Sequence, residues 1–201
     1  YIKRHLAPEL AEQVMALGLP GVALQREYRR FYPAGEVTAH VVGFTNIDDR
    51  GQEGIELAYN DWLQGEPGAK RVIKDRLGRI IDDVESLREP RPGKALRLSI
   101  DRRLQYLAYR ELKAAAAEQG VRSASLVLLD VTTGEVLAMV NQPGYNPNNR
   151  LEINSQAARN RAVTDAYEPG STIKVFSVAA ALEAGHFRPD SVIDTGPGYM
   201  R

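Results

Sequence analysis

The chain of 201 residues contains no cysteine, which excludes a disulfide framework, a thiolate nucleophile and a cysteine-based metal site. No run of about 18 apolar residues occurs, so no segment reads as a membrane-spanning helix. The 26 basic and 26 acidic side chains cancel, which leaves no global field to attract nucleic acid. The length still suffices for one large or two modest domains, each able to bury a core.

Patterns for metal, nucleotide and paired-carboxylate chemistry are missing as well. The three histidines, His5, His40 and His186, are scattered without the paired spacing of a metal site. No glycine-rich phosphate-binding pattern is present, and the two adjacent aspartate pairs fall in expected turns or strand ends. We therefore expect no metal, no cofactor and no nucleic acid partner.

The most informative motif is Ser171-Thr172-Ile173-Lys174, which follows a Pro-Gly turn and opens an apolar, alanine-rich segment. Positions i and i+3 share one face of a helix, so the lysine amine can reach the serine hydroxyl. That hydroxyl is a weak nucleophile unless a base takes its proton, and a helix N-terminus supplies N–H groups for a developing oxyanion. We predict Ser171 as nucleophile and Lys174 as base. The alternative is a capping serine followed by a solvated lysine.

The residues around this motif resemble one family, the class B penicillin-binding proteins, whose nucleophile motif is S-x-x-K. Two stretches before Ser171 resemble the approach to the nucleophile: 145–149 and 159–170. Three earlier stretches are similar to successive motifs of the pedestal domain: 30–35, 51–56 and 74–78. Residues 32–46 are closest to the division-specific branch, the penicillin-binding protein 3 type of Gram-negative bacteria. The resemblance covers essentially the whole chain.

The resemblance implies an α+β fold in two parts. A pedestal (dimerisation-type) domain is expected over residues 1–92, with the linker-like stretch 89–93 at its end. Residues 93–201 are expected to form the opening part of a penicillin-binding, β-lactamase-like transpeptidase domain with an antiparallel sheet and the S-x-x-K helix. The S-x-N and K-T-G or K-S-G motifs that complete such a site do not occur in this sequence. We expect the rest of the catalytic domain and an N-terminal membrane anchor to lie outside this chain.

The function implied by the resemblance is that of a serine D,D-transpeptidase that cross-links peptidoglycan stem peptides during septal cell-wall synthesis. Ser171 would attack the penultimate D-Ala carbonyl, Lys174 would take its proton, and β-lactams would acylate the same serine. The implied partners include the septal glycosyltransferase and other division-complex membrane proteins. The implied location is the inner membrane, single-pass, with this region in the periplasm.

Two alternatives stay open at this point. One is a penicillin-sensing or β-lactamase-like protein. The other is a non-catalytic interaction module of the division complex, because this stretch alone, without the two further motifs, is expected to be inactive.

Local patterns predict the secondary structure. Apolar spacing favours helices at 8–17, 53–63, 102–119 and 171–184, with Asp101 as a cap and Gly18, Gly120 and Gly185 as stops. Residues 37–44 are read as a short helix or a buried strand. Strands are predicted at 22–32, 70–75, 80–84, 96–100, 124–131 and 135–141, with turns about Leu77-Gly78 and Thr132-Thr133-Gly134. The expected core includes Ile55, Leu57, Tyr59, Trp62, Leu104, Leu107, Ala108, Leu112, Ala115 and the doubly buried run Val127-Leu128-Leu129. Charge pairing is expected among Arg30, Glu56, Lys74 and Asp75.

Overall fold

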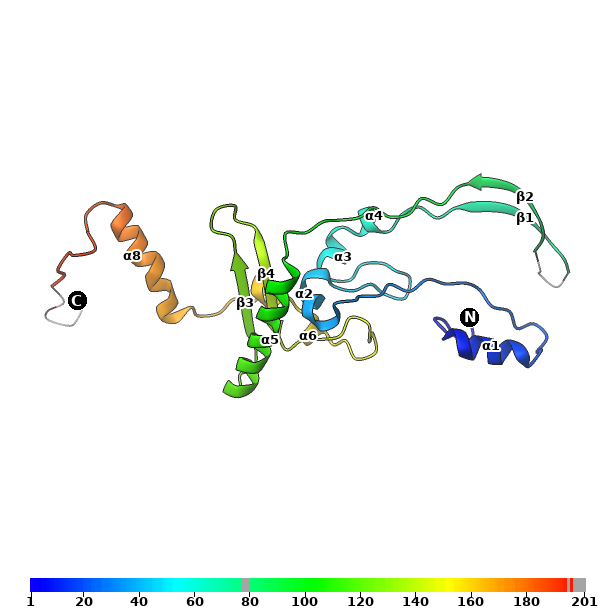
Figure 1. The fold of residues 1–201 in the computed structure, drawn as a ribbon, viewed down its shortest axis with the longest axis horizontal. Coiled ribbons are helices and arrows are strands. Elements are labelled where there is room, and N and C mark those ends of the chain that lie inside the picture. The colour runs from blue at the N-terminus through cyan, green and yellow to red at the C-terminus, as the bar shows by residue number, and fades with distance from the viewer. Residues whose placement is uncertain (77–79, 195, 197–201) are drawn as a thin grey trace. The chain divides into compact units, whose positions relative to one another are not determined.

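The computed structural model describes residues 1–76, 80–194 and 196 (Figure 1). The chain divides into two compact units, Tyr1–Thr164 and Asp165–Arg201. In the described residues the strands form two separate two-stranded antiparallel sheets, β1–β2 and β3–β4. The α+β class with antiparallel pairing is confirmed, whereas a domain boundary between residues 92 and 93 stays a prediction.

The first unit begins with a helix that local signals define. Helix α1 (Pro8–Ala16) has a proline in its first turn, and Gly18 adopts a positive φ of 61° just beyond its end. The strand expected over 22–32 is wrong, because this segment has no ladder partner among the described residues. Side chains fix it instead, as in the ion pair of Arg4 with Glu27 at 2.8 Å.

Four short helices follow in the chain. They are the 3₁₀ helix η1 (Gly35–Thr38), α2 (Ala39–Val42), α3 (Gly54–Ala58) and α4 (Asn60–Leu63). The chain leaves helical geometry at Tyr59, with φ −117° and ψ 26°, and this splits the helix predicted over 53–63. The choice left open for 37–44 is settled as helix.

The buried side of this region was predicted incorrectly. Leu57, Tyr59 and Trp62 are exposed by 54%, 46% and 45%, whereas Glu56 is only 5% exposed. Glu56 can be buried because its carboxylate takes two hydrogen bonds from the Arg30 guanidinium, at 2.7 and 3.1 Å. The expected pairing of Arg30 with Glu56 is thus confirmed.

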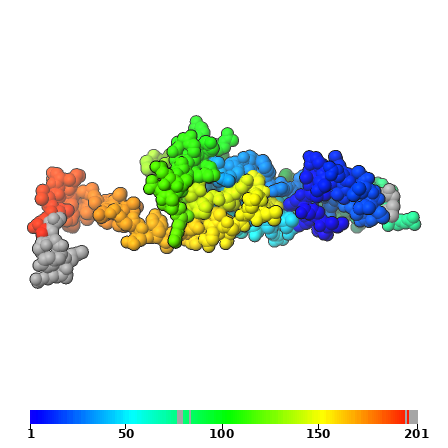
Figure 2. Space-filling model, turned by 90° about the horizontal axis from the view of Figure 1, so that it is seen from below, coloured from blue at the N-terminus to red at the C-terminus, as the bar shows by residue number. Residues whose placement is uncertain are grey.

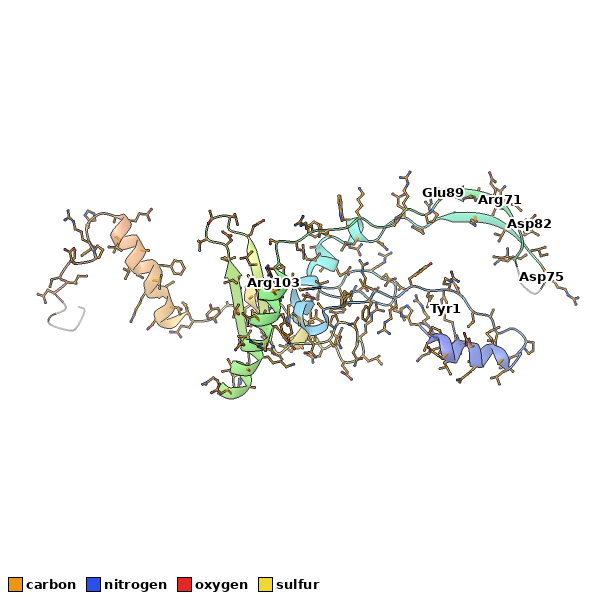
Figure 3. The ribbon with its side chains drawn as sticks, in the orientation of Figure 1. Tyr1, Arg71, Asp75, Asp82, Glu89 and Arg103 are labelled. Atoms are coloured by element: carbon orange, nitrogen blue, oxygen red, sulfur yellow. The ribbon has the colours of Figure 1, made fainter. Side chains whose placement is uncertain are left out.

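The predicted hairpin forms from β1 (Ala69–Lys74) and β2 (Ile80–Arg88), which pair antiparallel. Its expected turn about Leu77-Gly78 lies outside the described residues. Arg71 and Asp82 mark the two strands in Figure 3. Beyond β2 the proline-rich stretch is tied back to the chain after α4, since Glu66 and Arg91 exchange two backbone hydrogen bonds of 2.8 and 2.9 Å.

Helix α5 (Arg102–Gln119) agrees with its prediction at both ends. Asp101 Oδ1 accepts hydrogen bonds from the backbone N–H groups of Arg103 and Leu104, at 2.8 and 3.2 Å. Gly120 closes the helix in the left-handed region at φ 59°. Of the expected core positions, Ala108 is buried and Leu104 and Leu112 pack against it, but Leu107 and Ala115 are exposed.

The second hairpin packs on α5. Strand β3 (Ala124–Leu129) pairs with β4 (Val136–Gln142), and Ala138 and Val140 of β4 are buried against the helix. The run 127–129, predicted to be buried on both faces, is instead 39–52% exposed. The strand expected over 96–100 is also wrong. Individual hydrogen bonds attach the segment 96–100 to β4 instead, such as that from Ser99 Oγ to Val136 O at 2.8 Å.

A second small core in the first unit joins α2 to residues 145–158. It contains Ala39 of α2, Tyr145, and two alanines of α6 (Ser155–Ala158). The Tyr145 hydroxyl donates to Ala39 O at 2.8 Å, and His40 Nε2 lies 2.8 Å from Ala157 O. In Figure 2 the segments near residues 40, 110 and 150 lie packed against one another. Helix α7 (Arg161–Thr164) ends this unit.

In the described part of the second unit, the 3₁₀ helix η2 (Gly170–Ile173) continues directly into α8 (Lys174–Glu183). Gly185 follows with φ 72°, which confirms the predicted end of this helix. Across the described ranges, no helix combines the length and apolar character needed to cross a bilayer.

Candidate active site

The two residues singled out by the S-x-x-K motif lie on one helical turn. Ser171 is in η2 and Lys174 is the first residue of α8. The backbone N–H of Lys174 donates to the carbonyl oxygen of Ser171, which is the i to i+3 bond of a 3₁₀ turn. Side chains three residues apart are eclipsed in that geometry, so both project from the same side of the helix. The turn therefore brings a hydroxyl and an amine to one face.

The start of this helix is shaped by residues 169 and 170. Pro169 is the N-cap of η2, and Gly170 adopts a positive φ of 56°, which a residue with a side chain rarely adopts. Thr172 Oγ1 donates to Pro169 O and so closes the first turn. Ser171 itself follows the glycine at the point where the first backbone N–H groups of a helix have no helical acceptor.

Helix α8 carries a predominantly apolar surface next to these two residues. Val175 and Phe176 are 70% and 71% exposed, and Val178 is 58% exposed. Lys174 and Ser171 are exposed as well. Within this unit, Ser171 and Lys174 therefore lie beside exposed apolar side chains.

Two asparagines, Asn141 and Asn160, link β4 to α7 within the first unit. Asn141, at the end of β4, is 1% exposed, and its Oδ1 accepts from Ser125 Oγ at 2.7 Å and from the Ala162 N–H at 2.8 Å. Its Nδ2 donates to Asn160 Oδ1 at 2.8 Å. The sequence analysis did not identify these residues, and the only available signal was an asparagine at the end of an apolar strand.

Histidine 40 is a buried structural group. Burial lowers the pKa of the His40 imidazole below its ordinary value. The neighbouring carbonyl of Ala157 can only accept, so Nε2 carries the proton and donates to it. The ring of Tyr145 contacts it edge-on with 5.2 Å between centroids. Its role is to join α2 to α6.

A charged cluster fastens η1 to α5. Tyr109 donates its hydroxyl hydrogen to Glu36, and Lys113 Nζ lies 3.1 Å from Glu36 Oε2 and 2.9 Å from Tyr109 Oη. The hydrogen bonds from Tyr109 and Lys113 lower the pKa of the Glu36 carboxyl. Because each member has its partner within the cluster, we assign it a structural role between the two halves of the first unit.

No group of three or more His, Cys, Asp or Glu side chains in the described part of the chain is arranged to hold a metal ion. The candidate site itself offers the hydroxyl of Ser171 and the amine of Lys174 at the start of a helix.

Comparison with known proteins gives the chain a context. The model of the penicillin-binding protein dimerisation domain matches residues 2–98, and that of the penicillin-binding protein transpeptidase domain matches residues 124–201. The peptidoglycan D,D-transpeptidase FtsI of Escherichia coli K12 is 50% identical over 197 residues, which are 98% of this chain and 33% of that protein.

The probable peptidoglycan D,D-transpeptidase PenA of Neisseria meningitidis is 47% identical over 199 residues, which are 98% of this chain and 34% of that protein. Among solved structures, penicillin-binding protein 3 of Mycobacterium tuberculosis is similar, with a TM-score of 0.68 and 30% identity over 82% of this chain and 34% of that one. The chain thus spans about a third of the length of the relatives it matches.

Proposed function

Because this chain belongs to the penicillin-binding proteins, we propose that the protein is a serine D,D-transpeptidase that cross-links peptidoglycan stem peptides during cell division. The observation that carries the proposal is the turn that sets Ser171 and Lys174 on one face at the start of α8. The division-specific role is supported by the 50% identity to FtsI.

The reaction proceeds through an ester on Ser171. The Oγ attacks the carbonyl carbon of the penultimate D-Ala of a stem peptide, and Lys174 takes the hydroxyl proton. The peptide bond to the terminal D-Ala breaks, and that residue leaves with a proton on its amine. An amine of a neighbouring stem then attacks the ester, which forms the cross-link and restores the Ser171 hydroxyl. Backbone N–H groups stabilise the oxyanion in both steps.

β-Lactams acylate the same serine in this proposal. Their strained ring amide is attacked as the peptide bond would be, but the amine that leaves stays attached to the acyl group and blocks the site. Penicillin-binding protein 3 of Mycobacterium tuberculosis has been solved in complex with aztreonam and with ampicillin. That relative supports the ligand class for this chain.

The same proposal also gives the location and the partners of the protein. The protein is anchored in the inner membrane by a single span, with residues 1–201 in the periplasm. Its partners are the septal glycosyltransferase and other membrane proteins of the division complex, which the N-terminal part of the chain would contact.

A time course with fluorescent penicillin tests the function in the whole protein that carries this sequence. We expect rapid stoichiometric labelling and slow release, because a transpeptidase does not hydrolyse the penicilloyl ester efficiently. Rapid turnover of the label would indicate a β-lactamase-like protein instead. Absence of labelling would leave the non-catalytic interaction module and contradict the proposal.

A further inference from the structure

Two aromatic side chains that were expected in the core lie at the surface of the first unit. Tyr59 stands at the junction of α3 and α4, and Trp62 belongs to α4; they are 46% and 45% exposed. The backbone N–H of Trp62 donates to Tyr59 O at 3.0 Å, which is an i to i+3 bond. Residues three apart lie on the same side of such a turn, so both rings belong to one surface.

The same surface contains a hollow. It has a volume of about 430 Å³ and is lined by six consecutive residues, 57–62. This volume lies within the range of small-ligand sites. Leu57 adds a further apolar side chain, which is 54% exposed, whereas Asn60 and Asp61 add an amide and a carboxylate. The lining thus combines apolar surfaces with hydrogen-bonding groups.

The Trp62 ring is held in place by its neighbours. Lys94 Nζ lies over the ring, 4.5 Å from its centroid, and the indole N–H donates to Ala95 O at 3.3 Å. The backbone is tied as well, since the Lys94 N–H donates to Trp62 O at 3.0 Å. The ring is therefore ordered before any ligand binds, and a ligand that stacks on it has little side-chain freedom left to remove.

The polar groups of the hollow are partly ordered by one another. Asn60 Oδ1 accepts from the Gly51 N–H at 3.0 Å, and Asn60 Nδ2 donates to Asp61 Oδ1 at 3.0 Å and to Gln64 Oε1 at 3.3 Å. A carboxylate can accept about four hydrogen bonds, so Asp61 keeps acceptor positions for a ligand. The Tyr59 hydroxyl makes no hydrogen bond to any residue that the structure describes.

This combination of groups matches the chemistry of amino sugars. The faces of a pyranose ring carry C–H groups, whose partial positive charge suits the negative face of an aromatic ring. Hydroxyl and acetamido groups stand at the edges of the sugar ring, where they need donors and acceptors such as an amide, a carboxylate and a phenol. Of the six lining residues Asp61 alone carries a charge, which favours an uncharged ligand over an ionic one.

We propose that this hollow binds the sugar strand of peptidoglycan, with Tyr59 and Trp62 stacking on sugar rings and with Asn60 and Asp61 bonding to groups at the ring edges. The identity of the strand rests on the proposed function, because stem peptides are carried on a polymer of β-1,4-linked amino sugars. The binding is non-covalent and does not involve Ser171. It contributes affinity for a part of the substrate that does not react.

The test measures binding of a tetrasaccharide of β-1,4-linked N-acetylglucosamine, an uncharged and peptide-free probe, to the whole protein by isothermal titration calorimetry. We expect saturable binding that persists after penicillin has acylated the protein, because the hollow does not include Ser171. Tyr59→Leu removes one ring and keeps an apolar side chain. Its affinity for the probe should fall about fivefold or more, the scale of one lost aromatic contact.

Trp62→Leu should weaken binding by at least as much. Since Trp62 also bonds to Ala95, that variant can lose its fold, whereas the Tyr59 side chain has no hydrogen bond to lose within the described chain. Tyr106→Leu is the matched control. Tyr106 is a tyrosine of α5 in the same unit, 55% exposed and outside the lining of the hollow. The control should bind the probe within about twofold of wild type, as expected for a surface substitution.

The outcomes separate this inference from the proposed function. A wild-type protein that does not bind the probe overturns the inference, and penicillin labelling, measured separately, still decides the proposed function. Wild-type affinity in folded Tyr59→Leu overturns the inference too, as does an equal loss in Tyr106→Leu. A protein that binds the probe through Tyr59 but is not labelled at Ser171 supports the sugar site and contradicts the proposed function.

Discussion

At the scale of single residues, the chain buries several polar and charged side chains together with their hydrogen-bond partners. Glu56 is the clearest case. It is 5% exposed, lies between the predicted core residues Ile55 and Leu57, and is held by the two hydrogen bonds of Arg30. Breaking such a pair from one side leaves a charge without its partner, which costs more than the pair itself contributes.

Arg30→Met should therefore destabilise the protein. We expect the free energy of unfolding to fall by roughly 2–3 kcal/mol, somewhat less than for a fully buried pair, because the Arg30 side chain is 39% exposed. Arg30→Met combined with Glu56→Gln should recover part of the loss. Equilibrium urea unfolding measures both. A single Arg30→Met variant as stable as wild type would contradict the assigned role of the pair.

Because His40 is buried, we expect the stability of the protein to depend on pH. Its folded-state pKa is lowered by burial, whereas in the unfolded chain it stays near about 6.5. Below that pH the unfolded state binds the extra proton more readily, so His40 reduces stability as the pH falls toward the folded-state pKa. Urea unfolding between pH 7.5 and 5 should show a smaller loss for His40→Gln than for wild type. If both proteins lost the same stability between these pH values, the pKa of His40 would not change on folding, and the prediction would be contradicted.

Lys174 should not tolerate replacement by another cation. Arginine keeps the positive charge but cannot give up its proton to act as a base. We expect Lys174→Arg to lower the acylation rate by penicillin at least about 100-fold, the usual scale of general-base catalysis. Stopped-flow acylation measures this directly. An arginine variant that reacts at nearly the wild-type rate would remove Lys174 from the mechanism.

At the scale of elements, the predictions succeeded where the signal is local. The bounds of α5 follow from an aspartate before its first residue and a glycine after its last, and both residues act as expected. The two hairpins follow from alternation and turn residues. The segment over 22–32 has strand-like composition but no neighbour to pair with among the described residues, and composition alone cannot supply one.

Buried polar residues mark where the sequence analysis failed. Gln105 is 1% exposed and bonds to the backbone of Val37 and of Met139, which belong to segments far apart in the sequence. Nothing in the periodicity of α5 distinguishes it from a solvated glutamine. The same holds for Asn141 and Asn160. Their role depends on contacts that only the folded chain creates.

The cap of α5 allows a quantitative test at this scale. Asp101→Ala removes the acceptor of two backbone N–H groups, and we expect a loss of about 1 kcal/mol in the free energy of unfolding. Asp101→Asn keeps an oxygen at the same place and should cost much less. Thermal and urea unfolding of the two variants provide the comparison. Equal losses would show that the oxygen does not act as the cap.

At the scale of the whole molecule, the chain divides into two units, Tyr1–Thr164 and Asp165–Arg201. The first unit holds its parts together through two small cores and the polar links at His40, Asn141 and Gln105. The second carries Ser171 and Lys174 on one turn beside exposed apolar side chains. The sequence predicted that turn because both residues belong to one local motif. It did not predict the buried amides of Gln105 and Asn141.

The central claim is that Ser171 is the residue that becomes acylated. The most direct test is peptide mass spectrometry of the whole protein after incubation with penicillin, with Ser171→Ala and, as a control on the same helix, Ser177→Ala. We predict a penicilloyl adduct on the peptide containing Ser171 in the wild type and in Ser177→Ala, and none in Ser171→Ala. A folded Ser171→Ala protein that still carries the adduct would contradict the account.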